Sequence, residues 1–273
     1  MRRLLYAASV LVLLAAGELY VLTDHTDRYF AWTIHPGLTA AFLGGGYLAA
    51  FFLEFLSARQ RVWANARLAV PAVLAFTVLT LVATLGHLDK FHFGNRHPVA
   101  SFSTWAWLAI YTVVPIFMVI LLVREAHQPR ADPPRRAPIP LSVLVVVGAQ
   151  GAALLSLGAA LFVAPTSVSY WPWALTPLTA QAVGAWLLSV GLGAIHATRE
   201  RDLLRIRPGA VTLALLSLFQ LIALARYPHD VDWARPAAWI YLGFVLSLLV
   251  VGLLGWVLGH RRVSLVDGPS TGG

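Results

Sequence analysis

The sequence predicts an all-α, polytopic membrane protein, and three observations lead to this fold class. Hydrophobic residues make up 59% of the 273 residues, charged residues only 12%, and the mean hydropathy is +0.73. Long apolar stretches recur at lengths close to the roughly 20 residues that a helix needs to cross a bilayer. These stretches are continuous and do not alternate with polar residues, which favours helices over the strands of a barrel.

Eight membrane-spanning helices are predicted, and polar or charged residues separate them. The arginines from Arg199 to Arg207 are assigned to a loop, which leaves the seventh span as the shortest. Pro115 lies inside the fourth span, where the missing backbone hydrogen bond predicts a kink. The predicted spans are residues 4–22, 38–56, 69–88, 104–123, 141–163, 178–197, 210–225 and 237–258.

Most of the basic residues fall on one side of these spans and predict their orientation. Because cytoplasmic loops of membrane proteins are rich in Lys and Arg, we expect both termini in the cytoplasm and the protein in the cell (inner or plasma) membrane. The asymmetry also explains the net charge of +8, so a lipid bilayer is the expected partner and nucleic acid is not. The basic residues of this side are Arg2, Arg3, Arg59, Arg61, Arg67, Arg124, Arg130, Arg135, Arg136, Arg199, Arg201, Arg205, Arg207, Arg261 and Arg262.

The chain matches itself at a spacing of about 140 residues, which predicts an internal duplication. Residues 32–40 align with residues 173–180, and Arg59 aligns with Arg199. Because each half has an even number of spans, we expect two tandem, parallel four-helix repeats related by a pseudo-twofold axis along the membrane normal. The first span has a counterpart in the fifth, which argues against a cleaved signal peptide.

The duplication divides the chain into four segments. Residues 1–125 form the first four-helix repeat and residues 141–260 the second. Between them, residues 126–140 are rich in Pro and Arg and are expected to form an exposed cytoplasmic linker. Residues 261–273 are expected to form a flexible cytoplasmic tail. A membrane-protein partner and a homo-oligomer both remain open.

Several classes of chemistry are excluded by the sequence. The absence of cysteine excludes disulfides, thiolate metal sites and a cysteine nucleophile. The glycines at 44–46 lie inside a span and no Lys-Ser or Lys-Thr follows them, which excludes a phosphate-binding loop. No nucleophile elbow is present.

Two carboxylates lie inside predicted spans of the first half. Glu18 is about one turn from the outer end of its span, and Glu54 is about one turn from the inner end of its own. Ionisable groups are costly in a bilayer and often serve as proton or ion relays, which makes both residues candidates for a relay or for substrate binding. The alternative is that both are satisfied at the membrane interface, where Arg59 or Arg61 would pair with Glu54.

Histidines and aspartates gather at the outer ends of the first half. Imidazole and carboxylate together are common metal ligands and common acid–base pairs. The spacing matches no specific motif, so wet loops without a ligand are the competing interpretation. The candidate metal ligands are His87, Asp89, His92 and His97.

Haem is the other cofactor that the arrangement brings into question. Duplicated four-helix units with histidines near one membrane face resemble the architecture of membrane haem proteins such as haem A synthases. In this chain, however, His35 aligns with Thr176 and His87 with Tyr227, so no histidine is repeated. No cofactor is therefore favoured, and metal and haem stay as minor alternatives.

Three functions are compatible with these features. The leading hypothesis is a transporter or permease-like protein for a small solute, ion or lipid, with Glu18 and Glu54 as relay groups. One alternative is a membrane enzyme or metal- or haem-binding redox protein with its site at the outer face of the first repeat. The other is an accessory or assembly subunit of a membrane complex. The residues assigned to an outer gate are Asp24, His35, His87 and Asp89.

Overall fold

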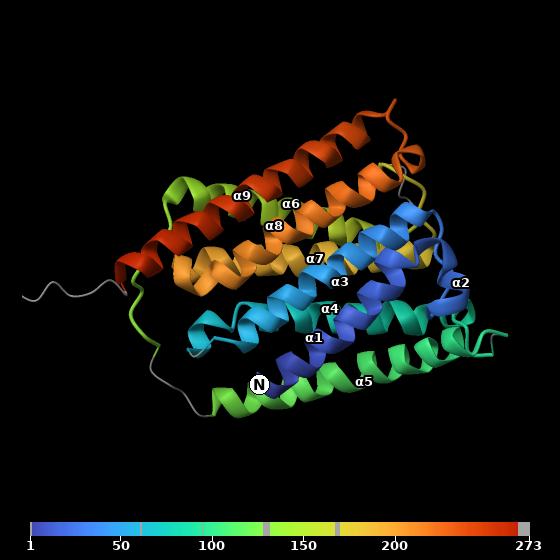
Figure 1. The fold of residues 1–273 in the computed structure, drawn as a ribbon, viewed down its shortest axis with the longest axis horizontal. Coiled ribbons are helices and arrows are strands. Elements are labelled where there is room, and N and C mark those ends of the chain that lie inside the picture. Colours follow the sequence, from blue (N-terminus) through green and yellow to red (C-terminus); the bar gives the residue numbers. More distant parts are fainter. Residues whose placement is uncertain (1, 61, 95, 128–131, 167–169, 267–273) are drawn as a thin grey trace, which may run out of the picture.

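The computed structural model describes residues 2–60, 62–94, 96–127, 132–166 and 170–266 (Figure 1). In this part of the chain the fold is all-α, and eight helices are long and apolar enough to cross a membrane, which confirms the polytopic, multi-pass class. These helices are α1 (Arg2–Ala16, continued by a π-helical turn at Gly17–Val21), α3 (Gly37–Ala58), α4 (Ala69–Gly86), α5 (Pro98–Ala126), α6 (Leu141–Val163), α7 (Pro177–Glu200), α8 (Leu203–Arg226) and α9 (Pro236–Val266). A short helix, α2 (Thr26–Tyr29), lies between α1 and α3.

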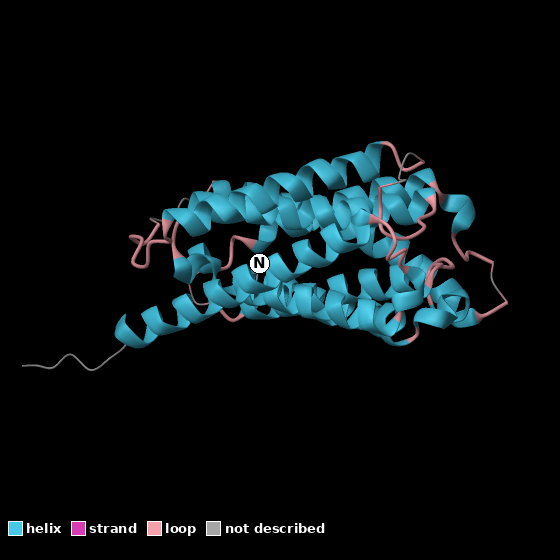
Figure 2. Ribbon diagram, turned by 90° about the horizontal axis from the view of Figure 1, so that it is seen from above, coloured by secondary structure: helices cyan, strands magenta, loops and turns pink. Residues whose placement is uncertain are grey.

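The long helices run along one another, and their connections gather at two ends of the molecule (Figures 1 and 2). We call the end that holds the α3–α4, α5–α6 and α7–α8 connections the basic end. The opposite end, which holds α2 and the α4–α5, α6–α7 and α8–α9 connections, is called the histidine end. The arginines and the histidines that the sequence placed on opposite sides therefore lie at opposite ends of one bundle.

The helices of the two halves of the chain are interleaved. Helix α1 packs along α3, α6 along α7, and α8 along α9, so each of these pairs is close in sequence. The most extensive contacts between the halves join α3 to α8 and α4 to α7, whereas the consecutive helices α3 and α4 make few contacts with each other. The first four spans therefore do not form a separate bundle, because their inner helices pack on those of the second half.

Glycine allows the closest approaches between these helices. At Gly44 of α3, an added Cβ would lie 2.5 Å from the backbone nitrogen of Tyr20 in the π-helical turn. At Gly252 of α9, it would lie 2.5 Å from the backbone nitrogen of Ala214 in α8. Small residues at such crossings bring helix backbones into contact, which is a common basis of association in membranes.

Helix α8 begins earlier than predicted, at Leu203 instead of residue 210. Asp202 is its N-cap, and the Asp202 Oδ1 atom accepts hydrogen bonds from the backbone N–H groups of Leu204 at 2.9 Å and Arg205 at 3.3 Å. The prediction placed these arginines in a loop because arginine is costly in lipid. It was wrong at this point because Arg205 is neutralised by carboxylates, as described below.

The linker segment is docked on the basic end in its second part. The Asp202 Oδ2 atom accepts hydrogen bonds from the backbone N–H groups of Arg136 at 2.6 Å and Ala137 at 3.0 Å. The linker was expected to be exposed, whereas Ala137 and Ile139 within it are buried. Residues 128–131 of the linker and 267–273 of the predicted tail lie outside the described residues, and α9 continues to Val266.

The substitution Gly252→Ala is expected to destabilise the protein, because the added methyl group would overlap the backbone of Ala214. Overpacking of this kind costs about 1–3 kcal/mol. The midpoint of thermal unfolding in detergent should fall measurably. The control is Gly243→Ala on the same helix, where an added Cβ meets no atom within 4 Å. An equal midpoint for the two variants would contradict the close contact between α8 and α9.

Candidate functional site

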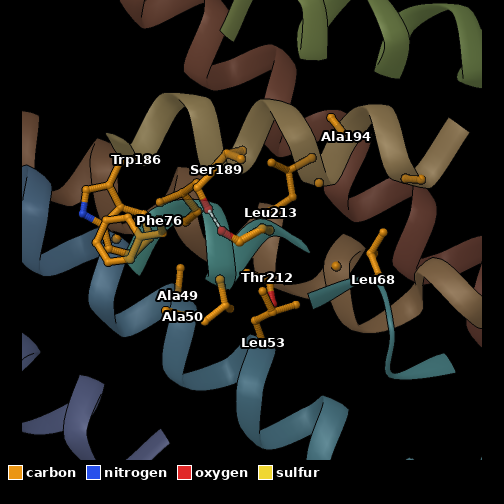
Figure 3. A pocket seen from close by; sticks show the side chains of 18 of the residues that line it. Ala49, Ala50, Leu53, Leu68, Phe76, Trp186, Ser189, Ala194, Thr212 and Leu213 are labelled. Atoms are coloured by element: carbon orange, nitrogen blue, oxygen red, sulfur yellow. Dashed lines mark hydrogen bonds between the residues drawn. The ribbon is translucent and has the colours of Figure 1, made fainter. Parts of the chain in front are cut away.

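A cavity of about 190 Å³ lies inside the bundle, and all eight long helices contribute to its wall. Figure 3 shows Phe76 and Trp186 together at one end of this cavity and Leu68 at the other. The wall is almost wholly apolar, with alanine, leucine, valine and glycine as its main residues. A cavity of about 150 Å³ in a small protein is enough to hold benzene, so this one has room for a small organic molecule.

Glu54 is the only carboxylate among the residues that line the cavity. Its side chain comes from α3 and is 2% exposed, and its Oε2 atom has no hydrogen-bond partner among the described residues. Arg59, which the sequence suggested as its partner, lies instead over the ring of Phe55 at 5.6 Å. Arg61, the other suggested partner, lies outside the described residues. The carboxylate is thus buried and open to a partner that enters the cavity.

Most hydroxyl groups along the wall already have a partner within the protein, including that of Tyr111, which pairs with the Tyr47 hydroxyl. Ser189 donates to the carbonyl of Ala72 at 2.7 Å, and Thr77 donates to that of Leu74 at 3.0 Å. The Oγ1 atom of Thr212, on the α8 side of the cavity, has no partner among the described residues (Figure 3). The wall therefore offers few unpaired polar groups besides Glu54.

Aromatic rings close the cavity toward the histidine end. Phe76 of α4 and Trp186 of α7 lie with ring centroids 4.1 Å apart. Both also line a much smaller space beyond the cavity, together with Trp32 and Trp107. These rings belong to the largest hydrophobic core of the molecule, which separates the cavity from the loops of that end.

Apolar residues and an ion cluster close the cavity toward the basic end. The apolar layer contains Leu68, Ala197, Leu203 and Ile206 of the cavity wall, together with Ala137 and Ile139 of the linker segment. The charged residues Arg67, Glu200 and Arg205 directly flank this layer in the sequence. The two closures of the cavity therefore differ in chemistry.

The ion cluster centres on the Glu200 carboxylate, whose side chain is 5% exposed. Arg67 donates from Nε to Oε1 at 2.6 Å and from Nη2 to Oε2 at 2.9 Å, which is a bidentate pair. Arg205 donates to Oε2 from Nη1 at 2.9 Å, and its own side chain is 4% exposed. Asp132 of the linker segment accepts from both arginines, at 2.9 Å and 3.2 Å. The cluster joins the turn before α4 to α7, α8 and the linker.

The pKa of Asp132 reflects this cluster. Burial opposes ionisation of this carboxyl, but the hydrogen bond and charge of Arg67 and the charge of Arg205 outweigh it, so its pKa lies below the ordinary value. The interaction therefore contributes stability at neutral pH, and this contribution is lost as the pH falls through the lowered pKa. Since the Asp132 side chain is 48% exposed, the effect of this carboxylate alone is small.

The predicted relay group Glu18 lies away from the cavity. It sits in the π-helical turn at the histidine end of α1, and its Oε1 atom accepts a hydrogen bond from Ser103 of α5 at 3.0 Å. Ser103 also donates to the backbone carbonyl of Tyr29 at 2.9 Å. Glu18 therefore has a partner that links two helices, and the structure does not bring it together with Glu54.

Of the predicted outer-gate residues, Asp24 has a partner in the second half of the chain. Tyr227, which aligns with His87 in the duplication, donates to the Asp24 carboxylate at 3.4 Å and also pairs with the Thr23 hydroxyl. His35 is exposed between α2 and α3. The neighbouring helix α3 is capped by Asp230, whose Oδ2 atom accepts from the backbone N–H of Leu38 at 2.9 Å. The sequence offered no signal for this cap because Asp230 is remote from α3 in the chain.

The candidate metal ligands have separate partners. His87 lies 3.1 Å from the carbonyl of Ala83 through Nδ1, and both ring nitrogens of His92 lie 3.0 Å from oxygen atoms of the segment 30–33. Lys90 donates a hydrogen bond to Asp89, which holds the pKa of that exposed carboxyl below its usual value. Neither these residues nor His97 belong to a group of three or more metal-ligating side chains within the described part of the chain.

Comparisons of the chain with protein-family models, with curated proteins and with solved structures gave no match. The geometry of the cavity is therefore the main guide to function.

The substitution Arg205→Met is expected to destabilise the protein strongly, because it leaves the buried carboxylate of Glu200 with one arginine partner fewer. Breaking a buried ion pair from one side costs about 3–5 kcal/mol, and the remaining Arg67 should keep the loss near the lower value. Thermal unfolding in detergent measures the change. Arg199→Met is the control, since Arg199 is exposed one residue before Glu200. A similar unfolding temperature for both variants would show that the cluster does not hold the basic end together.

Proposed function

We propose that this integral membrane protein transports a small solute, and that the solute binds in the central cavity. The observation that carries the proposal is the buried carboxylate of Glu54, whose Oε2 atom has no partner among the described residues, in a cavity walled by all eight spans. A membrane protein with a purely structural role gains nothing from an unpaired carboxylate in an internal cavity, since such a group is costly in a bilayer.

The closures of the cavity favour a transport site and argue against a void that has no function. One closure consists of aromatic rings and the other of an apolar layer backed by ion pairs. Each can open without the other, because different residues form them. In the proposed alternating-access cycle, the two closures open in turn. The predicted outer-gate residues Asp24, His35, His87 and Asp89 lie beyond the aromatic closure and retain their proposed role at that entrance.

The proposed duplication fits the same function. The pairings α1 with α3 and α4 with α5 have counterparts in α6 with α7 and α8 with α9, and α3 with α8 has a counterpart in α4 with α7. If the two halves are exchanged, each of these helix pairings is therefore replaced by its counterpart. Two parallel repeats related by an axis along the bundle require this equivalence. The cavity then lies on that axis, between the inner helices. We place this bundle in the cell membrane with the basic end in the cytoplasm, following the positive-inside rule.

Transport can be tested without knowledge of the solute. Proteoliposomes are exposed to a mixture of small amines, amino acids, carboxylic acids and neutral organic solutes, and the vesicle contents are quantified by mass spectrometry. We expect uptake of at least one component above that of protein-free vesicles. The variant Gly193→Leu should lower this uptake at least tenfold, because Gly193 lines the cavity and an added Cβ there makes only an ordinary contact, 3.7 Å from the Cβ of Ala72.

The control variant is Gly243→Leu, because an added Cβ at Gly243 meets no atom within 4 Å and Gly243 does not line the cavity. It should transport as the unmodified protein does. If Gly193→Leu folds and transports at the unmodified rate, the solute does not pass through this cavity. If the unmodified protein takes up none of the classes in the mixture, the proposal of a small-solute transporter is wrong.

A further inference from the structure

We infer that the ligand of the central cavity is a small organic monocation, in which an ammonium group pairs with Glu54 and an apolar body fills the remaining space. This inference rests on the proposed function only in calling the ligand a transported solute. The binding site itself is argued from the residues around the cavity.

The charge of the ligand follows from what the wall lacks. No lysine, arginine or histidine is among the residues that line the cavity, and Glu54 Oε2 has no partner in the described part of the chain. A carboxyl group in such a place is neutralised either by a proton or by a positive charge beside it, and the lining residues supply no positive charge. A cation in the cavity completes the pair, whereas an anion would meet repulsion from the same carboxylate.

The organic body of the ligand follows from the rest of the wall. Phe76, Tyr111 and Trp186 present aromatic rings to the cavity, and most other lining residues are aliphatic. Aromatic faces attract ammonium groups, and apolar walls favour an apolar body through burial of its surface. The volume of about 190 Å³ limits that body to roughly the size of one small ring or a short alkyl chain.

A bare metal ion fits this wall less well. Hard divalent cations take about six to eight oxygen ligands, whereas here one carboxylate is accompanied by hydroxyls that already donate to backbone carbonyls. No group of three or more metal-ligating side chains includes Glu54 among the described residues. An ammonium group needs only one carboxylate and a few neighbouring acceptors, such as the free Thr212 hydroxyl.

The test is binding to the purified full-length protein in detergent, measured by isothermal titration calorimetry. Three probes share one ring and differ in charge: benzylammonium, benzyl alcohol and benzoate. Butylammonium tests a smaller apolar body. We expect at least one of the two ammonium probes to bind, with at least tenfold higher affinity than the alcohol or the benzoate.

Substitution of the carboxylate should remove this selectivity. Glu54→Gln is expected to weaken ammonium binding at least tenfold and to leave binding of benzyl alcohol unchanged, since it keeps the size of the side chain. The matched control is Glu18→Gln, which changes a carboxylate outside the cavity and should leave ammonium binding as it is. A thermal unfolding curve verifies that each variant is folded.

Three outcomes would overturn the inference: no ammonium binding to the folded protein, equal binding of the neutral probe, or unchanged ammonium binding in Glu54→Gln. Failure of the transport proposal gives a different result. If benzylammonium binds through Glu54 but no amine enters proteoliposomes, the cation site stands and transport is wrong. If a neutral or acidic solute is taken up and no ammonium probe binds, transport stands and the cation site is wrong.

Discussion

Inside a bilayer a polar group has no water to bond with, and the rest of this structure depends on that constraint. Hydroxyl groups within the helices meet it locally, as when Thr84 donates to the carbonyl of Thr80 at 2.8 Å and Ser217 to that of Leu213 at 2.8 Å. Glu18 meets it through Ser103. Among the described residues, the few buried side-chain atoms that remain unpaired include one carboxylate oxygen, that of Glu54. This atom belongs to a residue of the cavity wall, which is the basis of the proposed binding site.

The cavity itself follows from how the helices are shared between the halves. Because α3 packs on α8 and α4 on α7, the four inner helices come from both halves. Glycine-mediated contacts hold the pairs together, such as α8 with α9 at Gly252. Each pair is thus tightly packed, while the space enclosed by the pairs is not filled. A single four-helix unit made from one half would not have this interior.

Much of the fold could be predicted from the sequence, because hydropathy and helix length follow from the properties of single segments. All eight spans lie near their predicted positions. Helix α9 runs to Val266 instead of ending at residue 258, and the error that bears on the basic end is the start of α8 at Leu203 instead of residue 210. That error has a physical cause: Arg205 is costly in lipid alone but not beside Glu200 and Asp132, and these partners are distant in the chain or in another element. The hydropathy of single segments does not predict ion pairs between residues that are distant in the chain.

The same limit applies to the site. Polarity within a span marked Glu54 as a candidate, but the sequence also offered pairing with Arg59 or Arg61, and only the packing shows that Arg59 lies over Phe55 instead. The closures were not predicted at all, because Phe76 and Trp186 belong to different halves and read as ordinary core residues. The histidines were conspicuous in the sequence, yet His92 serves to hold the loop before α3.

The two closures have unequal consequences for opening. Separation of Phe76 from Trp186 exposes apolar surface, and the free-energy cost is proportional to the area exposed. An apolar ligand that covers the same surface offsets this cost. In the proposed cycle, separation of Arg67 and Arg205 from Glu200 would break ion pairs in which Arg205 and Glu200 are buried, and this costs more than the separation of two rings. The Asp132 carboxylate, which is half exposed and comes from the linker between the halves, is already in contact with solvent. It bonds both Arg67 and Arg205 alongside Glu200, and these bonds tie the linker segment to the basic end of the bundle.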